Sequence, residues 1–354
     1  MSTKQNKFSF FTKLAFQQAD INLGSTSSNP SVGCVIVHND TVISSGHTSQ
    51  HGRPHAEANA LNQKLNFKNS ILFSSLEPCS HYGKTGPCTK KIIKNKIKKV
   101  VFSVPDHDPR SANKAQDILK KNKIFVKKNV LINYGRTFYQ SYNNNVLPYL
   151  DGKIAVSKDF FSINKKNKFI TNEHSRKIGN FLRSKYDCLL TTSKTVNADD
   201  PLLNCRLEGL THKSPQIAIL DRGFKINLNL KIIKEHSKKV FLIINKENKK
   251  KEIILKRRGV KILKIKDKNN KLRDLLIMLK KNNFNRIFVE SGLTFINNLI
   301  KNKLINRLYI FQSMLRLAKK GDNKSSPLNI KKLIKKNNKI EINLKGDTLY
   351  QIKI

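Results

Sequence analysis

The stretch Arg53-Pro54-His55-Ala56-Glu57-Ala58-Asn59-Ala60-Leu61 decides the fold, together with Leu76-Glu77-Pro78-Cys79 and Cys88 further along the chain. It supplies one imidazole, two thiols and a carboxylate placed two residues after the imidazole. His55, Cys79 and Cys88 make a three-ligand zinc set, and three protein ligands leave the fourth tetrahedral position open for water. We therefore predict a catalytic zinc site in which Glu57 carries the proton.

This order of residues, His-x-Glu followed by Pro-Cys and a second Cys, is typical of zinc-dependent nucleobase deaminases. Because Pro78-Cys79 stands at the end of a predicted strand and before a helix, helix-terminal N–H groups favour a thiolate at Cys79. The alternative is a closed structural zinc site. Such a site usually has four protein ligands, so Glu57 would have to be the fourth.

The first half of the chain alternates between predicted strands and helices. Phe8, Phe11 and Leu14 recur at helical spacing and predict an amphipathic first helix. Apolar runs predict strands over 32–37, 41–45, 71–76 and 100–104, and helices are expected from Ala56 onward and over 89–95. A β-hairpin followed by βαβ units predicts an α/β domain with helices covering a sheet.

A polar break, Tyr142-Asn143-Asn144-Asn145, separates the two halves, so we predict domains over 1–145 and 146–354. The second half again alternates. Strands are predicted over 188–190, 217–220, 240–244, 260–265 and 287–289, and helices over 175–183, 272–280 and 293–301. The tail predicts a hairpin of 340–344 and 349–354, closed at Gly346-Asp347.

The composition excludes some functions and leaves others open. The five cysteines are too few and too scattered for a disulfide scaffold, which indicates a reducing, cytoplasmic setting. The chain contains no long apolar run, so we expect no membrane span. The net charge of +45 is compatible with a nucleic-acid partner. The basic residues are spread along the chain, however, so we favour compositional drift and expect no nucleic-acid partner.

The spacing of the two cysteines narrows the class of deaminase. In cytidine and tRNA-adenosine deaminases two residues separate them, whereas the eight residues Ser80-His81-Tyr82-Gly83-Lys84-Thr85-Gly86-Pro87 do so here. This loop resembles the deaminase half of the bifunctional riboflavin-biosynthesis deaminase/reductase family. So do Asn29-Pro30-Ser31-Val32-Gly33-Cys34-Val35-Ile36-Val37 and Gly46-His47 leading to Gly52-Arg53-Pro54-His55. One departure is Asp106-His107-Asp108-Pro109, where the family has Asp-Pro-Asn-Pro. Asn113 and Ala115 then replace a pair of glycines.

The resemblance implies a cytidine-deaminase-like α/β/α domain and hydrolytic deamination of 2,5-diamino-6-(5-phosphoribosylamino)pyrimidin-4-one. It also implies a group of residues around that phosphorylated pyrimidine, namely Asn29, His47, Ser80, His81, Lys84 and Thr85. Their chemistry is suitable, because a lysine and hydroxyl groups can hold a phosphate. The family further suggests a homo-oligomer.

The second half resembles the reductase domain of the same family, which has a dihydrofolate-reductase-like α/β fold. The segments that carry the resemblance are Lys153-Ile154-Ala155-Val156-Ser157-Lys158-Asp159, Phe169-Ile170-Thr171, Thr195-Val196-Asn197-Ala198-Asp199-Asp200-Pro201-Leu202-Leu203 and Val289-Glu290-Ser291-Gly292. The resemblance implies that NADPH reduces the ribosyl to a ribityl chain. By resemblance, NADPH would contact Ala155, Phe169, Thr195, Asp199 and Gly292. The substrate would contact Asn167, Arg183, Leu203, Arg206 and Glu290.

Three alternatives stay open at this point. The reductase half could be degenerate, since Phe160 stands where a glycine is expected after Asp159, Leu293 replaces a proline or glycine, and Asn306-Arg307 replaces an acidic pair. The chain could instead be a nucleic-acid-editing zinc deaminase, a hypothesis motivated by its charge. It could also be a non-enzymatic, zinc-stabilised scaffold that binds RNA through its basic second half.

Overall fold

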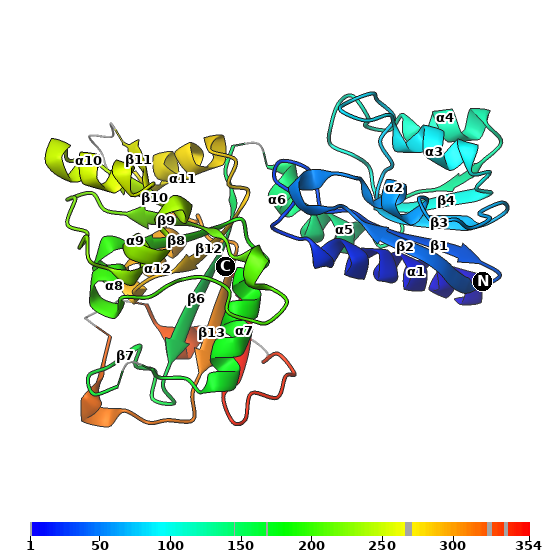
Figure 1. The fold of residues 1–354 in the computed structure, drawn as a ribbon. Coiled ribbons are helices and arrows are strands. Elements are labelled where there is room, and N and C mark those ends of the chain that lie inside the picture. The colour runs from blue at the N-terminus through cyan, green and yellow to red at the C-terminus, as the bar shows by residue number, and fades with distance from the viewer. Residues whose placement is uncertain (1, 145, 168, 266–270, 324–327, 336–338) are drawn as a thin grey trace. The chain divides into compact units, whose positions relative to one another are not determined.

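The computed structural model describes residues 2–144, 146–167, 169–265, 271–323, 328–335 and 339–354 (Figure 1). The chain forms two compact units, Met1–Asn144 and Asn145–Ile354. None of the described helices is both long enough and apolar enough to cross a membrane. All five cysteines are free thiols.

The first unit contains a five-stranded sheet in the order β2-β1-β3-β4-β5. Its strands are β1 (Gly33–His38), β2 (Thr41–His47), β3 (Ile71–Leu76), β4 (Lys99–Val104) and β5 (Phe125–Lys127). Its helices are α1 (Ser2–Ile21), α2 (Ala56–Ala60), α3 (Cys88–Lys94), α4 (Ala115–Lys121), α5 (Ile132–Phe138) and α6 (Gln140–Asn143). β1 and β2 form the expected antiparallel hairpin, and β3, β4 and β5 run parallel to one another.

Alternation along β1 gives this sheet two buried faces. Val35 and Val37 pack against Phe11 and Ala15 of α1, whereas the neighbouring Cys34 and Ile36 belong to the core that contains Ala56 of α2. Helices therefore cover both faces of the sheet, with α1 on one side and α2 on the other (Figure 1). This confirms the predicted α/β/α layering and the predicted amphipathic first helix.

The second unit contains an eight-stranded sheet in the order β11-β10-β9-β8-β12-β6-β13-β15. Its strands are β6 (Tyr149–Val156), β8 (Cys188–Thr192), β9 (Gln216–Leu220), β10 (Val240–Ile244), β11 (Lys261–Lys264), β12 (Arg286–Glu290), β13 (Arg307–Gln312) and β15 (Thr348–Lys353). A separate pair joins β7 (Ile163–Asn164) and β14 (Gly321–Asp322). The helices are α7 (Glu173–Arg183), α8 (Ser193–Asp199), α9 (Lys231–Glu235), α10 (Lys249–Arg257), α11 (Leu272–Lys281), α12 (Leu293–Lys301) and α13 (Ile330–Lys335).

The large sheet is parallel except for β15, which runs antiparallel to β13. One of its faces packs against α11 and α12 through Leu275, Leu276 and Ile296, and the other packs against α9 and α10 through Ile232 and Leu255. In open sheets of this kind ligands bind beyond the carboxyl ends of the strands. Thr195 follows β8, and Glu290 and Gly292 lie at the end of β12, so the sheet brings these predicted residues to that edge.

The predicted tail hairpin is wrong in part. β15 pairs along its whole length with β13, from Arg307↔Lys353 to Gln312↔Thr348. In the described part of the tail, the first predicted arm forms no strand. The isolated bridges Lys339↔Tyr350 and Leu344↔Asp347 lie there, and the Ile340 N–H donates to the Leu349 carbonyl at 2.8 Å. The reason is that the edge of β13, a strand that the sequence reasoning missed, offers β15 a continuous ladder of backbone partners.

Candidate functional sites

Two close contacts fix the helix next to His55, one of the three predicted metal ligands. A Cβ built on Gly46 of β2 would lie 2.5 Å from Ala56 O and 2.5 Å from Ala60 N, so only a glycine lets α2 pack this closely on β2. Asn59 of the same helix donates through Nδ2 to the His47 carbonyl at 2.7 Å. These contacts hold the short α2, whose N-cap is His55 and whose first turn contains Glu57.

His55, Cys79 and Cys88 converge as the sequence predicts. Their ligand atoms all lie within 4.8 Å of one another, and the group contains three protein donors among the described residues. His55 Nδ1 lies 3.5 Å from Cys79 Sγ and 3.5 Å from Cys88 Sγ. With Zn–N and Zn–S bonds of ordinary length, a tetrahedral ion would separate these atoms by about 3.6 Å. The three side chains therefore fit a zinc ion, and Glu57 lies outside this set.

The charges in this cluster favour cation binding. The hydrogen bond from Cys88 lowers the pKa of Cys79 to about 4, and the neighbouring His55 adds to this effect. The Cys88 backbone N–H also donates to Cys79 Sγ at 3.3 Å. One of the two sulfurs is therefore a thiolate at neutral pH. Binding of a cation would release the proton that the pair retains, since zinc takes its cysteine ligands as thiolates.

Glu57 is almost fully buried beside the cluster, with 3% of its surface exposed. Burial raises its pKa above the ordinary value, and the negative charge of Cys79 raises it further. Ser74 Oγ donates to Glu57 Oε1 at 3.3 Å. A carboxyl group whose pKa is shifted toward neutrality can both take up and release a proton, which is what general acid–base catalysis requires.

The residues predicted around the pyrimidine lie on the segments that surround the three ligands. Asn29 donates through Nδ2 to the Gly52 carbonyl at 2.9 Å, next to the segment that leads to His55. His47 ends β2 and is half-buried. Ser80 Oγ is buried and has no hydrogen-bond partner in the described part of the chain. Lys84 and Thr85 are exposed in the loop between the two cysteines.

Sequence reasoning missed Arg53. Its guanidinium Nη1 donates a hydrogen bond to Thr85 Oγ1, so it is attached to the loop that carries Lys84. Its positive charge also opposes protonation of His55. Arg53 lies only two residues before His55, but an arginine in such a loop is usually solvated. Its contact with Thr85 depends on how the loop between Cys79 and Cys88 folds back.

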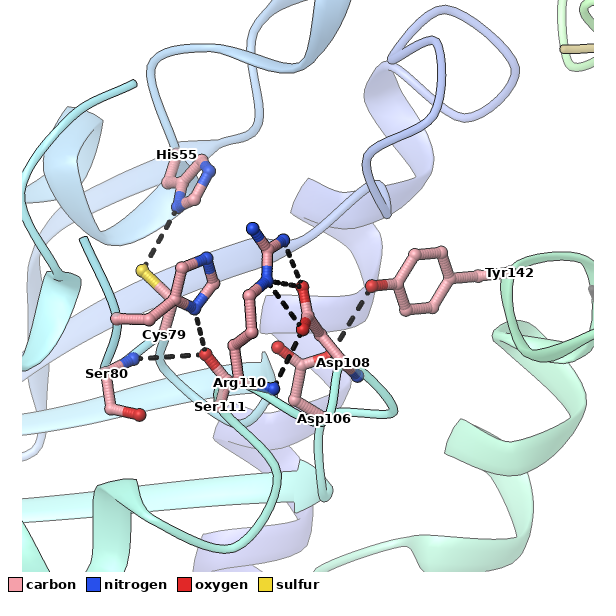
Figure 2. A network of polar contacts seen from close by, with 9 residues as sticks. His55, Cys79, Ser80, Asp106, Asp108, Arg110, Ser111 and Tyr142 are labelled. Atoms are coloured by element: carbon pink, nitrogen blue, oxygen red, sulfur yellow. Dashed lines mark hydrogen bonds and ion pairs between the residues drawn. The ribbon is translucent and has the colours of Figure 1, made fainter. Parts of the chain in front are cut away.

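Sequence reasoning also missed Ser111 and the carboxylate that fixes its loop. Glu77 is buried and accepts backbone N–H groups from Asp106 at 3.0 Å, Asn113 at 3.0 Å and Ala115 at 3.1 Å. The loop it holds brings Ser111 Oγ to 2.7 Å from His81 Nδ1 and 3.2 Å from the Ser80 backbone N–H (Figure 2). The segment that departs from the family pattern therefore contacts two predicted substrate residues directly.

In the second unit, Arg183 and Glu290 join at the carboxyl edge of the sheet. Arg183 Nε lies 2.6 Å from Glu290 Oε1, and Nη2 lies 3.0 Å from Oε2. Arg206 belongs to the same group: its Nη1 donates to Asn204 Oδ1 at 2.9 Å, while Arg183 donates to the Asn204 carbonyl at 2.9 Å. Two cations and one carboxylate make an anion-attracting site.

Lys153 is a further residue of this site that sequence reasoning did not single out. It lies on β6 directly opposite Glu290 of β12. Burial lowers its pKa, the charge of Glu290 opposes that shift and the charge of Arg183 adds to it. The sequence signal that could have identified Lys153 is a lysine inside a predicted apolar strand. Lysine is mostly exposed in proteins, and a lysine that is buried usually has a charged partner.

Some of the residues predicted to contact the nucleotide lie close to one another, and others do not. Thr195 Oγ1 lies 3.1 Å from Ser291 Oγ, and the adjacent Gly292 begins α12 with open space where a Cβ would stand. Such a helix start with an exposed glycine suits a phosphate group. Asp199 is exposed at the end of α8, and Ala155 is half-buried near the end of β6.

Three predicted residues lie apart from these contacts. Phe169 is 56% exposed, and the Arg176 guanidinium stacks on its ring at 4.5 Å. The Asn167 backbone N–H donates to Asn164 Oδ1 at 3.2 Å. Leu203 is buried in the apolar core with α8 and has a left-handed backbone, with φ of 55°. In the described part of the chain, no hydrogen bond or ion pair joins these three residues to Arg183 or Glu290.

Comparisons with known proteins agree with both halves. The family model for the cytidine and deoxycytidylate deaminase zinc-binding region matches residues 5–104. The model for the RibD C-terminal domain matches residues 148–315. The two matches fall on the two compact units, and the first contains all three predicted metal ligands.

Full-length relatives agree as well. The chain is 33% identical over 307 residues to riboflavin biosynthesis protein RibD of Aquifex aeolicus, covering 85% of each chain. It is 32% identical to RibD of Buchnera aphidicola, covering 85% of this chain and 86% of the relative. The solved structure of Acinetobacter baumannii RibD superimposes with a TM-score of 0.83 at 28% identity and covers 99% of both chains.

These matches confirm the predicted fold class, a cytidine-deaminase-like domain followed by a reductase domain. They also favour the bifunctional enzyme over the nucleic-acid editor and the scaffold, because they cover both halves of the chain. The chain belongs to the RibD family of riboflavin biosynthesis proteins, zinc- and NADPH-dependent enzymes with a deaminase and a reductase on one polypeptide.

Proposed function

We propose that the first unit deaminates 2,5-diamino-6-(5-phosphoribosylamino)pyrimidin-4-one and that the second unit reduces the ribosyl group of the product to ribityl. The convergence of His55 Nδ1 with Cys79 Sγ and Cys88 Sγ carries the first part, because both 3.5 Å separations suit a tetrahedral zinc ion. When bound, zinc supplies Lewis-acid activation of the water that displaces the amino group.

Within the first unit, Glu57 moves the proton. Its burial and raised pKa allow it to carry one proton of the attacking water to the ring nitrogen and then the second proton to the departing amino group, which leaves as ammonia. Ser80 Oγ, which is buried without a partner among the described residues, is available to the pyrimidine. Asn29 and His47 contribute further polar groups, and Lys84 and Thr85 hold the phosphate.

Within the second unit, Arg183, Arg206 and Glu290 bind the phosphorylated product, and Thr195, Asp199 and the Gly292 turn bind the nucleotide. Ala155 and Phe169 add contacts to the nucleotide, and Asn167 and Leu203 add contacts to the substrate. NADPH, when bound, supplies the hydride to C1′ of the ribosyl group. The paired charges of Arg183 and Glu290 hold both side chains rigid, so the residues have little conformational freedom to lose on binding.

Stepwise turnover followed by mass spectrometry tests both halves. Zinc-loaded protein given the diaminopyrimidine should release ammonia without NADPH and should then consume NADPH when it is added. Glu57→Gln should abolish ammonia release while zinc stays bound, and it should still reduce the deaminated product when that product is supplied. A deaminated product that the wild type never reduces would instead favour the degenerate reductase.

The proposal extends to the setting of the enzyme. We infer that it is a cytoplasmic homo-oligomer with no nucleic-acid partner. Its five free thiols suit a reducing compartment, and the small-molecule chemistry of both sites requires no nucleic acid. The homo-oligomer is inferred from the family resemblance. Light scattering measures the oligomeric state. Titration with tRNA and single-stranded DNA should show only weak binding, lost as salt rises and without base conversion.

A further inference from the structure

The segment from Asp106 to Ala115 is anchored by a buried carboxylate and contacts the residues that follow Cys79. Glu77, at the end of β3, accepts three backbone N–H groups from this segment. At the surface, Arg110 Nη2 and Asp108 Oδ2 form an ion pair at 2.5 Å (Figure 2). Ser111 lies between these two anchors and is fully buried.

The contacts of Ser111 define the direction of its hydroxyl hydrogen. The Ser80 backbone N–H donates to Ser111 Oγ at 3.2 Å, so one lone pair of that oxygen is occupied. In the described part of the chain, the remaining partner of Ser111 Oγ is His81 Nδ1, at 2.7 Å, and an N–H group at that position would leave the hydroxyl proton without an acceptor. Most buried hydroxyl groups have an acceptor for their proton. Ser111 therefore donates to Nδ1, and the neutral His81 ring has its own proton on Nε2.

The opposite edge of the ring faces the loop between the two cysteines. A Cβ built on Gly83 would lie 3.8 Å from His81 Nε2 and 3.2 Å from Arg53 Nη2. The Nε2–H group and the Arg53 guanidinium thus flank the same glycine, next to Lys84 and Thr85. Two hydrogen-bond donors on either side of a glycine form a surface for phosphate or sugar oxygens.

We propose that Ser111 is a positioning residue of the deaminase: it holds the His81 imidazole with Nε2–H directed at the ribosyl-phosphate part of the substrate. This inference rests on the proposed deamination of the phosphorylated pyrimidine. It assigns Ser111 to substrate binding and gives it no part in proton transfer at the metal site.

Three substitutions separate this role from simple packing. Ser111→Thr keeps the hydroxyl group, and Ser111→Val has nearly the same shape as threonine but lacks the hydroxyl, so any steric disturbance is shared by the two variants. Ser111→Ala removes the hydroxyl without adding bulk. Zinc content and thermal midpoint are measured for each variant, so that a misfolded one is recognised.

We expect Ser111→Val and Ser111→Ala to raise the KM of deamination by roughly 2- to 12-fold, the effect of one lost hydrogen bond. kcat should stay within about twofold of the wild type, and Ser111→Thr should restore KM. In ¹⁵N NMR of the zinc-loaded protein, His81 should be the Nε2–H tautomer in the wild type and the threonine variant, and a mixture of tautomers in the valine variant.

The outcomes separate this inference from the proposed function. If the wild type deaminates the substrate but the valine and threonine variants share the same KM and the same His81 spectrum, the Ser111 role is wrong and the deaminase stands. If zinc-loaded wild type releases no ammonia, the proposed function fails and the substrate role of Ser111 fails with it. A fall in kcat at unchanged KM would also overturn the inference.

Discussion

Arg183 and Glu290 lie 107 residues apart in the chain and form an ion pair with two parallel hydrogen bonds, of 2.6 and 3.0 Å. Each side chain is only 13% exposed. The charge of Arg183 contributes to lowering the pKa of Glu290 against the opposing effect of burial. The pair connects α7 to the end of β12, so the predicted substrate site and the stability of the second unit depend on the same contact.

Glu290→Gln should therefore lower both the stability of the second unit and the rate at which it reduces its substrate. The amide keeps the shape of the side chain but leaves the Arg183 charge without its carboxylate, and breaking a buried pair in this way costs about 3 kcal/mol. Urea unfolding of the full chain measures the loss. Glu173→Gln is the matched control, because Glu173 forms an exposed pair with Lys177 and its loss should have no measurable effect. Equal losses in the two variants would contradict the prediction.

Asp187 gives the second unit a distinctive pH dependence. Burial raises the pKa of Asp187 to about 7, even though the Asn285 and Arg286 backbone N–H groups donate to it. The folded-state pKa lies above the ordinary value of 3.8, so the folded chain binds this proton more tightly than the unfolded chain does. Stability should therefore fall as the pH rises from about 4 to about 7.

Asp187→Asn should remove that fall, since the amide cannot ionise and still offers a carbonyl oxygen to the two N–H groups. Urea midpoints of the wild type and the variant, compared at about pH 5 and about pH 8, measure the effect. The urea midpoint of the variant, relative to that of the wild type, should be higher at the higher pH than at the lower one. A difference that does not change with pH would show that Asp187 titrates normally.

Gly46→Ala should damage the metal site through the backbone. The new Cβ would stand 2.5 Å from Ala56 O and Ala60 N, so α2 would have to move away from β2 together with Glu57. Overpacking of this kind costs about 1–3 kcal/mol. Thermal melting and zinc titration measure the result. Gly179→Ala, in α7 with nothing within 4 Å of the built Cβ, should instead be neutral or stabilising.

Cys88→Ser should abolish tight zinc binding. The wild type should bind about one zinc per chain and should lose thermal stability when a chelator removes it, because metal binding contributes to folding. Elemental analysis of dialysed protein measures the content. Cys205→Ser is the control, since Cys205 is buried in the second unit and is not one of the three clustered donors. Full zinc retention in Cys88→Ser would contradict the assignment of Cys88 as a ligand.

The metal centre could be anticipated from the sequence because zinc accepts few types of ligand. One histidine and two cysteines at a recognisable spacing left little choice for His55, Cys79 and Cys88. Strongly apolar strands were also predictable: 240–244 matches β10 and 71–76 matches β3. In both strands most of the side chains are buried, so the apolar run in the sequence is enough to predict the strand.

Other features depend on contacts between distant segments. Ser111 acquires its role because Glu77 accepts hydrogen bonds from a loop 36 and 38 residues further along the chain, and no local pattern marks a serine for that role. Phe160 has a φ of 68°, a conformation that favours glycine, which explains why a glycine is expected there. Its ring packs partly against the main core. The amino-acid sequence alone shows neither the Glu77 contacts nor the backbone conformation and packing of Phe160.

The position of β6 in its sheet has a consequence for protein synthesis. Both hydrogen-bonding neighbours of β6, β12 and β13, are translated long after it. The metal-binding half can thus complete its sheet early on the ribosome, as N-terminal domains generally do. β6 meanwhile emerges with two unpaired edges, which can template aggregation. A chain truncated before Arg286 would therefore combine a complete sheet in the first unit with a β6 that lacks both of its neighbours in the second.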